Sequence, residues 1–375
     1  MYVRQASLSD FHLKSPWIEI PESLSRLGFS STIIAGKVRT SRPLRSRVRE
    51  SGVLGERLVN SLREFLRVIP MLREESPRLA IVYASMSLAP LYILLQRVGL
   101  NPSKAKNSGH NFKTVWINKL DWDGTNSPSV GLLANTLRKF VVAVTSHLYD
   151  WTTVEGRSSL RRISRIPMIN RGRLAVLEVG FPDDFYGLTK YEESEREKIV
   201  LCVARIAPEK GLSILLRAFA EARSQYPDWK LVLAGPVTDC AYFDELKREI
   251  LRLGLTTAVE LPGFLDDTDL HALYVKSSIF CLPSLLENAG QVRFEAMANG
   301  LPLITSETGT GIDLRESGAA VVPPGDLPSL VIVLKDLMSS SSKRAMAADS
   351  QQAHLRSYLE ICRQLVRQTC SNCQT

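Results

Sequence analysis

The chain contains 375 residues, of which 45% are hydrophobic and 23% charged, and its formal net charge is +8 at pH 7. This length and composition predict a globular protein of two domains and exclude fibrous and largely disordered chains. The basic balance favours an anionic ligand or surface among its partners.

The cysteines and the apolar segments indicate a cytoplasmic protein. Cys202 and Cys281 fall in predicted buried strands, where a thiol packs as a small apolar group. Cys370 and Cys373 form a single CxxC pair without a nearby histidine, so we expect reduced thiols there and not a metal site. The start of the chain lacks a basic-then-apolar leader, and we interpret the apolar stretch 79–95 as a strand and a helix instead of a membrane span.

Apolar strands alternate with amphipathic helices through the first half of the chain. Between residues 53 and 69, for example, the apolar residues recur with a helical period. The predicted strands of this half are 2–8, 31–35, 79–84, 114–118, 151–154 and 174–179, and the predicted helices are 17–27, 53–69 and 89–97. We assign residues 1–182 to a first domain.

The same alternation resumes after residues 183–198, a polar and charged segment that predicts a linker. The predicted strands of the second half are 199–204, 231–234, 259–261, 279–282 and 303–305, and the predicted helices are 212–223, 242–253, 267–276, 292–299 and 342–368. This pattern predicts an α/β fold with two Rossmann-like parallel-sheet domains facing across a cleft. We place the second domain at 199–341. A C-terminal helix and tail, 342–375, would follow it, frayed after residue 368, and packing of this segment on the first domain is one option.

The segment after the strand 279–282 carries the strongest functional signal. Glu287 falls on the loop beyond the carboxyl end of that strand, and Glu295 falls in the next helix, with Gly290 and Gln291 at the helix start. Ligands of open α/β sheets bind at this edge, and a helix start offers free amides to an anion. Carboxylates beside an anion site predict a ligand with phosphates and hydroxyls, such as a nucleotide sugar. The alternative is a helix cap and a surface carboxylate.

Three more loops of the second half are expected at the same edge. Arg205 and Lys210 follow its first strand and could neutralise a diphosphate, although a solvated basic loop has the same composition. Gly263 and Phe264 follow its third strand, where they form either the wall of a nucleobase pocket or an ordinary turn. A glycine-bearing loop at 308–311 could bring backbone amides to a phosphate.

With these motifs, residues 199–330 resemble the donor domain of the GT-B retaining glycosyltransferases of family GT4, the "glycosyl transferases group 1" type. The motifs are Ala204-Arg205 with Lys210-Gly211, Leu233-Ala234-Gly235-Pro236, Leu261-Pro262-Gly263-Phe264, the pair Glu287 and Glu295, and Val322-Pro323-Pro324-Gly325-Asp326. The resemblance implies that no cofactor and no essential metal are needed. It also implies that Arg205 and Lys210 hold the donor diphosphate. Glu287 would contact the transferred sugar, and Glu295 would bind the ribose hydroxyls.

Two loops depart from the family pattern. Where the family usually has Glu-Gly-Phe-Gly, this chain has Glu287-Asn288-Ala289-Gly290. The amides of Gly290 and Gln291 can still approach a phosphate, whereas Asn288 and Ala289 change the pocket. The N-terminal loop at 9–16 lacks the usual glycines. An inactive binding relative and a sugar-nucleotide epimerase of GT-B shape therefore stay as alternatives to a glycosyltransferase.

The first half would bind the acceptor, and Asp121 is the candidate there. It lies in the loop 119–124, after a strand whose following loop, in this fold, faces the cleft and carries a polar group near the acceptor. An aspartate at that place could orient an acceptor hydroxyl or accept its proton. An Asx turn that ends at Gly124 is the structural alternative. A metal site of Asp121 and Asp123 is disfavoured, because that motif belongs to the other glycosyltransferase fold.

Two basic segments of the first half suggest a membrane contact. Residues 37–49 carry six cations and no acid, and residues 157–173 carry six more. Basic amphipathic segments dock on anionic lipid, whereas a nucleic-acid surface would interleave aromatic residues with the charges. We expect no nucleic-acid partner and consider a peripheral contact with the cytosolic face of a membrane. A solvated basic loop is the alternative.

Together these features predict a cytoplasmic retaining glycosyltransferase. It would move a hexose from a nucleotide-diphosphate sugar to a hydroxyl of a glycan or lipid-linked acceptor. Arg205, Lys210 and the amides at the helix start would stabilise the departing diphosphate. Glu287 and Asp121 complete the predicted catalytic set.

Overall fold

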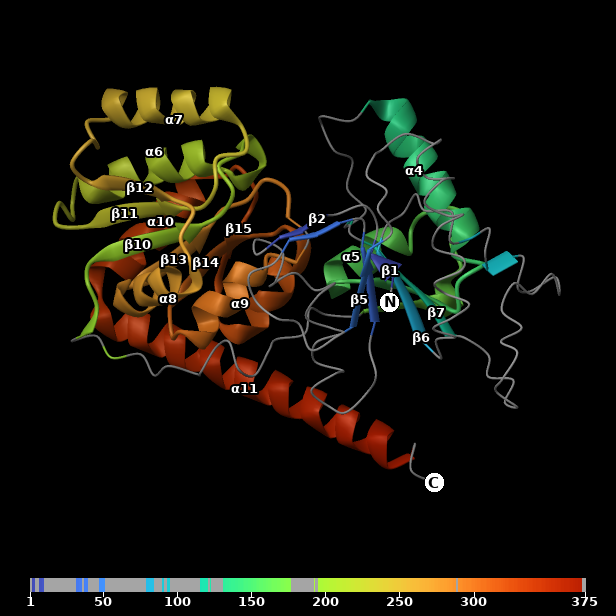
Figure 1. Cartoon of the computed structure of the whole chain (residues 1–375). Coiled ribbons are helices and arrows are strands. Elements are labelled where there is room, and N and C mark those ends of the chain that lie inside the picture. Colours follow the sequence, from blue (N-terminus) through green and yellow to red (C-terminus); the bar gives the residue numbers. More distant parts are fainter. Residues whose placement is uncertain are drawn as a thin grey trace. The chain divides into compact units, whose positions relative to one another are not determined.

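The computed structural model describes residues 2–3, 7–9, 32–35, 37–39, 47–50, 79–83, 90, 93–94, 115–120, 122, 131–176, 192, 195–287 and 289–372. The chain divides into two compact units, residues 1–182 and 183–375. Each unit contains a large sheet whose described strand pairs are all parallel, which confirms the predicted α/β class (Figure 1).

The sheet of the N-terminal unit has the strand order β5-β3-β1-β6-β7-β8-β9. Its strands are β1 (Tyr2–Val3), β3 (Thr32–Ala35), β5 (Arg47–Glu50), β6 (Leu79–Tyr83), β7 (Val115–Lys119), β8 (Trp151–Val154) and β9 (Leu174–Val176). A small pair, β2 (Ser7–Ser9) and β4 (Lys37–Arg39), lies outside this sheet. The predicted helices at 17–27 and 53–69 lie outside the described residues.

Among the described residues of this unit, α4 (Leu132–Thr145) follows β7 and α5 (Arg157–Ile163) follows β8. Val142 and Ala143 of α4 join a buried cluster with Leu120, Val154 and Ile163. Beside it, the Lys119 ammonium lies 3.3 Å from the Glu155 carboxylate, and both side chains are buried. The carboxyl end of β7 and the residue after β8 therefore share a buried ion pair.

The sheet of the C-terminal unit has the strand order β12-β11-β10-β13-β14-β15. Its strands are β10 (Ile199–Val203), β11 (Lys230–Ala234), β12 (Val259–Gly263), β13 (Ile279–Leu282), β14 (Leu303–Ser306) and β15 (Ala320–Val322). Its helices are α6 (Leu212–Arg223), α7 (Cys240–Arg252), α8 (Asp267–Lys276), α9 (Gln291–Ala298), α10 (Leu327–Ser339) and α11 (Ser341–Asn372).

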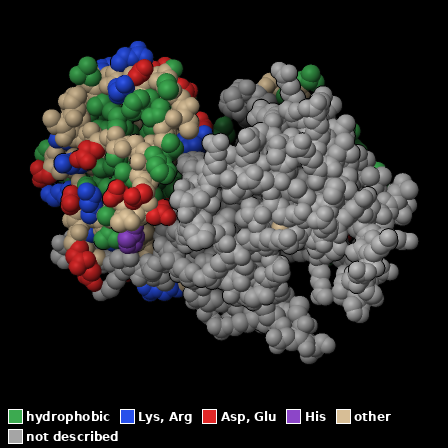
Figure 2. Space-filling model, in the orientation of Figure 1, with side chains coloured by type: hydrophobic (Ala, Val, Ile, Leu, Met, Phe, Trp, Pro, Cys, Tyr) green, Lys and Arg blue, Asp and Glu red, His purple; other side chains and the backbone are tan. Residues whose placement is uncertain are grey.

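Helices cover both faces of this second sheet. In Figure 1, α6 and α7 lie above the sheet, and α8, α9 and α11 lie below it. Every residue of β10, β13 and β14 is buried, as expected for continuous apolar strands between two helical layers. On the outer surface of this unit, Figure 2 shows acidic and basic side chains interspersed with apolar ones. Among the described helices, none combines the length and the apolarity needed to cross a bilayer.

The start of α11 packs on the C-terminal unit. The Gln351 side-chain oxygen accepts the amide of Leu303 at 3.1 Å, and the Gln352 amide donates to the Ala298 carbonyl at 3.3 Å. The helix continues to Asn372, beyond the predicted end at residue 368, so the expectation of a frayed segment from 369 onward is wrong for residues 369–372.

Candidate active site

Two loops meet at the carboxyl edge between β10 and β13, the neighbouring strands at which the sheet order reverses. Gly211 has φ +67°, and a Cβ atom added there would lie 2.3 Å from the carbonyl oxygen of Pro283. The amides of Leu285 and Leu286 donate to the carbonyl oxygen of Glu209 at 2.8 and 3.2 Å. Glycine is required at position 211 because the two loops are in backbone contact there. The two hydrogen bonds to Glu209 hold the loops together at this edge of the sheet. This reversal point is where open α/β sheets bind ligands.

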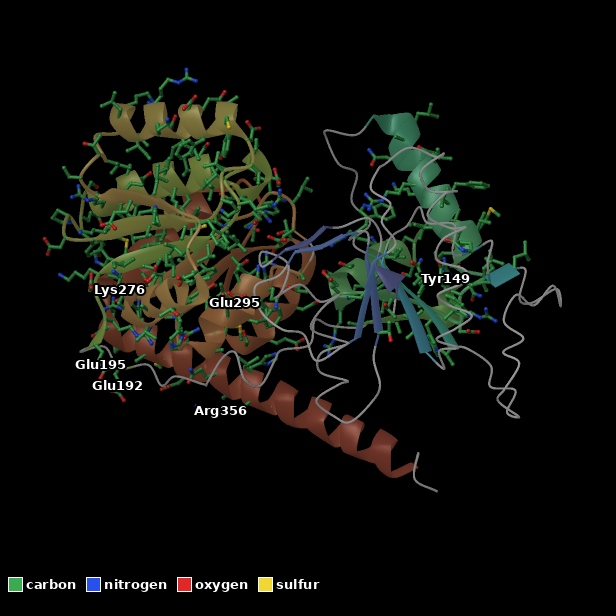
Figure 3. All side chains as sticks on the ribbon, viewed as in Figure 1. Tyr149, Glu192, Glu195, Lys276, Glu295 and Arg356 are labelled. Atoms are coloured by element: carbon green, nitrogen blue, oxygen red, sulfur yellow. The ribbon has the colours of Figure 1, made fainter. Side chains whose placement is uncertain are left out.

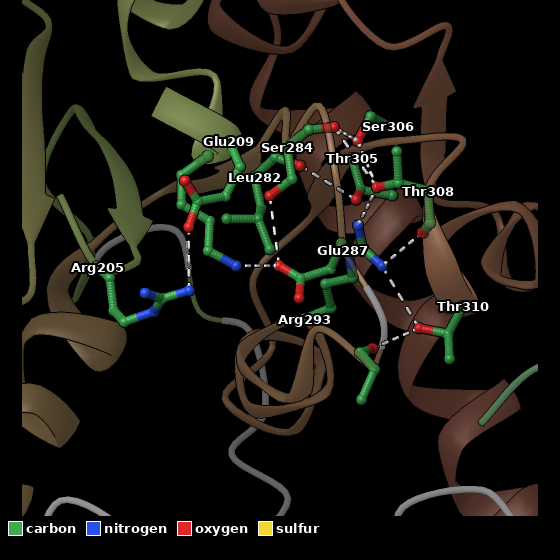
Figure 4. Close-up of polar contacts among 12 residues, drawn as sticks. Arg205, Glu209, Leu282, Ser284, Glu287, Arg293, Thr305, Ser306, Thr308 and Thr310 are labelled. Carbon is green, nitrogen blue, oxygen red and sulfur yellow. Dashed lines mark hydrogen bonds and ion pairs between the residues drawn. The ribbon is translucent and has the colours of Figure 1, made fainter. Parts of the chain in front are cut away.

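Each loop contributes to an ion pair at this edge. The Lys210 Nζ lies 2.8 Å from the Glu287 Oε2, with the side chains 12% and 13% exposed. Ser284 Oγ donates to the same carboxylate oxygen at 3.3 Å. Arg205 lies to one side, where its Nη2 contacts Glu209 Oε1 at 3.0 Å and its side chain is 44% exposed (Figure 4). The structure thus brings the predicted cations and Glu287 to one edge, where Lys210 and Glu287 are in direct contact.

The start of α9 is built by glycine and not by a polar cap. Gly290 is the N-cap residue with φ +59°, and no side chain caps the helix. The carbonyl oxygen of Ala289 accepts the Thr310 hydroxyl at 2.5 Å, which fixes the turn before the helix. The first amides of the helix, beginning at Gln291, form an end that favours an anion. Asn288 lies outside the described residues.

Arg293, in the first turn of α9, is a site residue that the sequence reasoning missed. Its side chain is fully buried, and its Nη1 donates to the Thr308 carbonyl at 3.0 Å (Figure 4). Burial lowers the pKa of the guanidinium to about 10, and the Glu287 carboxylate acts in the opposite direction. The available signal was periodicity: Arg293 precedes the buried Ala296 and Met297 by three and four positions, which places it on their face.

The other predicted contacts lie farther along the sheet or deeper in it. Glu295 is 3% exposed and accepts the Tyr274 hydroxyl at 2.9 Å, inside the unit (Figure 3). Gly263 is the last residue of β12, the edge strand, and Phe264 follows it with its side chain 60% exposed. Phe264 is thus available at the surface and is not part of the core.

Cys202, at the end of β10, lies near the ion pair. Burial raises its pKa to about 12, with Lys210 acting to lower it and Glu287 to raise it. Cys281 on β13 is also buried, and burial raises its pKa well above the ordinary value. Both thiols are therefore neutral near pH 7 and serve as small packing groups, not as nucleophiles.

Asp121 lies outside the described residues, as does Asp123. Within the described ranges, no three His, Cys, Asp or Glu side chains are grouped so that they could hold a metal ion.

Comparison with known proteins identifies the C-terminal part of the chain. The family model "Glycosyl transferases group 1" matches residues 188–353. This region is similar to the glycosyl transferases group 1 family, and we call it the group 1 domain. The resemblance inferred from the motifs is thereby confirmed, and the ion pair of Lys210 and Glu287 lies inside the matched region.

Two relatives illustrate the similarity in sequence. The chain is 29% identical over 206 residues to alpha-D-kanosaminyltransferase of Streptomyces kanamyceticus, covering 53% of each chain. It is 25% identical over 275 residues to a GDP-mannose-dependent alpha-(1-6)-phosphatidylinositol monomannoside mannosyltransferase of Mycolicibacterium smegmatis, covering 63% of this chain and 70% of the relative. The matches to curated relatives commonly span about half of the relative's length or less.

Solved structures share the fold over nearly the whole chain. The Anabaena protein HepE in complex with UDP has a TM-score of 0.72 at 17% identity, and sucrose-phosphate synthase of Thermosynechococcus elongatus has 0.73 at 16%. Each comparison covers 99% of both chains. The group 1 domain thus belongs to a chain of the GT-B fold, with two Rossmann-like domains.

Proposed function

We propose that this protein is a retaining glycosyltransferase that moves a hexose from a nucleotide-diphosphate sugar to a hydroxyl of a glycan or lipid-linked acceptor. The observation that carries the proposal is the contact of Lys210 with Glu287 at the reversal point of the group 1 domain, beside the uncapped start of α9. The UDP and UDP-glucose complexes of the structurally similar HepE support a nucleotide-sugar donor.

The proposed donor site separates charge stabilisation from sugar recognition. As the bond between the anomeric carbon and the diphosphate breaks, negative charge grows on the leaving phosphate oxygen. Lys210, Arg205 and the first amides of α9 stabilise that charge. When the donor binds, Glu287 exchanges its contact with Lys210 for contacts with the sugar to be transferred, so that it is in place before the bond breaks. Attack from the face that the diphosphate leaves retains the anomeric configuration.

The acceptor side of the proposal rests on Asp121, which orients the acceptor hydroxyl or accepts its proton. Phe264 is proposed to contact the nucleoside, and Gly263 allows the backbone to approach it. Glu295 is proposed to contact the ribose hydroxyls in exchange for its present hydrogen bond with the Tyr274 hydroxyl. The diphosphate charge is met by cationic side chains and amides, so the proposal requires no cofactor and no essential metal.

We also propose a cytoplasmic location with peripheral binding to an anionic membrane surface. The support is an exposed apolar face on α4, a helix with two cations and no acidic residue. The face consists of Leu133, Leu137, Phe140 and Val144, which are 84%, 53%, 56% and 40% exposed. Such a face inserts at the boundary of headgroups and acyl chains, while nearby cations attract anionic lipid.

The direct test is turnover of a nucleotide sugar by the purified chain and by two site variants. Glu287→Gln and Lys210→Ala should each reduce donor consumption by about two orders of magnitude or more, because each removes a group that acts on the breaking bond. Lys230→Ala and Glu260→Gln are matched controls, since these residues form an exposed pair at 3.2 Å on the same sheet.

The products separate the alternatives. A glycosyltransferase yields nucleoside diphosphate and a glycoside with the anomeric configuration of the donor, read by NMR. An altered sugar formed without any acceptor would identify an epimerase instead. Near-normal turnover in Lys210→Ala or Glu287→Gln would contradict the assigned roles.

A further inference from the structure

Arg293 places a full positive charge inside the group 1 domain, directly behind the start of α9. The residue is the third of the helix, and its side chain turns back over the helix start. A Cβ atom added to Gly290 would lie 2.9 Å from the Arg293 Cζ, Nε and Nη1 atoms. Gly290 is therefore required both for its φ of +59° and for the space that the guanidinium fills.

The same guanidinium ties α9 to the loop after β14. Nη1 donates to the Thr308 carbonyl at 3.0 Å and approaches the Thr310 hydroxyl at 3.4 Å, and Nη2 donates to the Thr308 hydroxyl at 3.2 Å. Thr310 in turn donates to the Ala289 carbonyl at 2.5 Å. One buried cation thus holds together two loops of the candidate donor site (Figure 4).

The hydrogen-bond acceptors of this guanidinium, among the described residues, are all uncharged. Its Nε is buried and has no hydrogen-bond partner there. Glu287 attracts Arg293 through space, but its carboxylate is in contact with Lys210 at 2.8 Å. Around the Lys210–Glu287 contact, the described side chains therefore place two cations, Lys210 and Arg293, against one carboxylate, since the buried Glu295 accepts the Tyr274 hydroxyl instead. A buried charge is costly without a counter-charge, and a bound diphosphate would supply it.

We propose that Arg293 is a positioning residue for the donor diphosphate. Its guanidinium places a positive charge behind the amides at the start of α9, and its hydrogen bonds fix those amides against the loop after β14. The inference rests on the proposed function, since it assigns the counter-charge to a nucleotide-sugar donor. Arg293 acts through the loop and through the field at the helix start, without touching the donor itself.

The structure also indicates why the charge can be removed without unfolding. Each group that Arg293 contacts keeps another partner: the Thr308 carbonyl accepts the Gly311 amide at 2.8 Å, the Thr308 hydroxyl lies 3.0 Å from the Ser306 hydroxyl, and Thr310 donates to Ala289. Arg293→Met is close in length and leaves none of these groups unsatisfied. A buried charge carries a desolvation penalty, which the neutral methionine side chain does not have.

The experiment is isothermal titration of the full-length protein with the nucleoside diphosphate that binds best among UDP, GDP and ADP, and with the matching monophosphate. We expect Arg293→Met to weaken diphosphate binding about tenfold or more, and monophosphate binding by less. Arg293→Lys, which keeps the charge, should retain most of the affinity. If Arg293→Met is insoluble, Arg293→Gln is also neutral and keeps a donor for the Thr308 carbonyl.

Arg344→Met is the matched control, because Arg344 is also a buried arginine of this unit but caps α10 by donating to the Leu337 carbonyl at 2.7 Å. It should change the Tm and not the Kd. Unchanged diphosphate affinity in a folded, neutral Arg293 variant would overturn the inference, as would a Lys variant that binds as weakly as the Met variant. Failure of the wild-type protein to bind any of the three diphosphates would contradict the proposed function itself.

Discussion

At the scale of single residues, the site depends on Gly211, because the loop after β10 passes too close to the loop after β13 for any side chain there. Gly211 and Gly254 have nearly the same φ, +67° and +68°, but very different surroundings. A Cβ atom on Gly211 would lie 2.3 Å from the Pro283 carbonyl oxygen, whereas one on Gly254 would meet nothing within 4 Å. The pair therefore separates the cost of the backbone conformation from the cost of the close approach.

We predict that Gly254→Ala lowers the free energy of unfolding by about 1 kcal/mol, the ordinary cost of alanine in the left-handed region. Gly211→Ala should lower it by several times that amount and should also weaken nucleotide binding, because the Lys210 loop must move away from the Glu287 loop. Denaturant unfolding of both variants and titration with a nucleoside diphosphate check this. Equal unfolding free energies of the two variants would show that the close approach to Pro283 does not add to the cost of a side chain at position 211.

At the scale of elements, most helices and strands of the C-terminal half could be predicted from the sequence. Two of the helices that were not predicted, one in each half, were missed for physical reasons. The structure gives α6, α8 and β13 the bounds predicted from the sequence, because each begins and ends at a clear change of polarity. No helix was predicted at α10 or α4. Nine of the thirteen residues of α10, LPSLVIVLKDLMS, are apolar or proline, so its period is hidden. The exposed apolar face of α4 likewise hides the usual pattern.

The sequence predicts the site residues that lie in loops after strands, but it does not predict the site residue whose side chain is buried. Arg205, Lys210 and Glu287 all lie in loops that follow predicted strands, so the parallel sheet brings them to one edge. The contact between Lys210 and Glu287, which are 77 positions apart, depends on the strand order and could not be predicted from the sequence. Arg293 was missed because the helical period places it on the face of Ala296 and Met297 but does not show that a charged side chain is buried there.

One ion-pair cluster links α6 to α7 and gives a pH prediction. Arg217 Nε on α6 and Arg252 Nη2 on α7 each lie 2.8 Å from the Glu249 carboxylate. The hydrogen bond from Arg217 is the largest cause that lowers the pKa of Glu249. A carboxyl whose pKa is lower in the folded state stabilises the protein above its unfolded pKa. That contribution is lost as the pH falls through the folded value.

We therefore predict that Glu249→Gln lowers the Tm near pH 7 and that its difference from the wild type shrinks as the pH falls below about 4. Thermal unfolding between neutral and acidic pH measures both curves. A difference that stays constant down to the lowest pH would mean that the carboxylate does not link the two helices electrostatically.

At the scale of the whole molecule, the two units differ in what they present to partners. The group 1 domain carries the candidate donor site, and the N-terminal unit carries the exposed apolar face of α4. If this face binds a membrane, it would bring the protein to a lipid-linked acceptor.

We predict that the protein floats with vesicles that contain anionic lipid and that Leu137→Glu with Phe140→Glu abolishes flotation, because both residues lie in the exposed face of α4. Ile332→Glu is the matched control, an apolar residue of α10 that is 66% exposed in the other unit. Flotation that survives the α4 changes would assign the lipid contact to another surface, and a wild-type protein that does not float would contradict the proposed membrane binding.

The central claim is that Lys210 and the start of α9 hold a diphosphate at the reversal point of the C-terminal sheet. Titration of the wild type, Lys210→Ala and Lys230→Ala with UDP, GDP and ADP tests it most directly. We predict that one of these nucleotides binds the wild type and Lys230→Ala with the same Kd and binds Lys210→Ala at least about tenfold more weakly. Equal affinity of Lys210→Ala and the wild type for the bound nucleotide would contradict the claim.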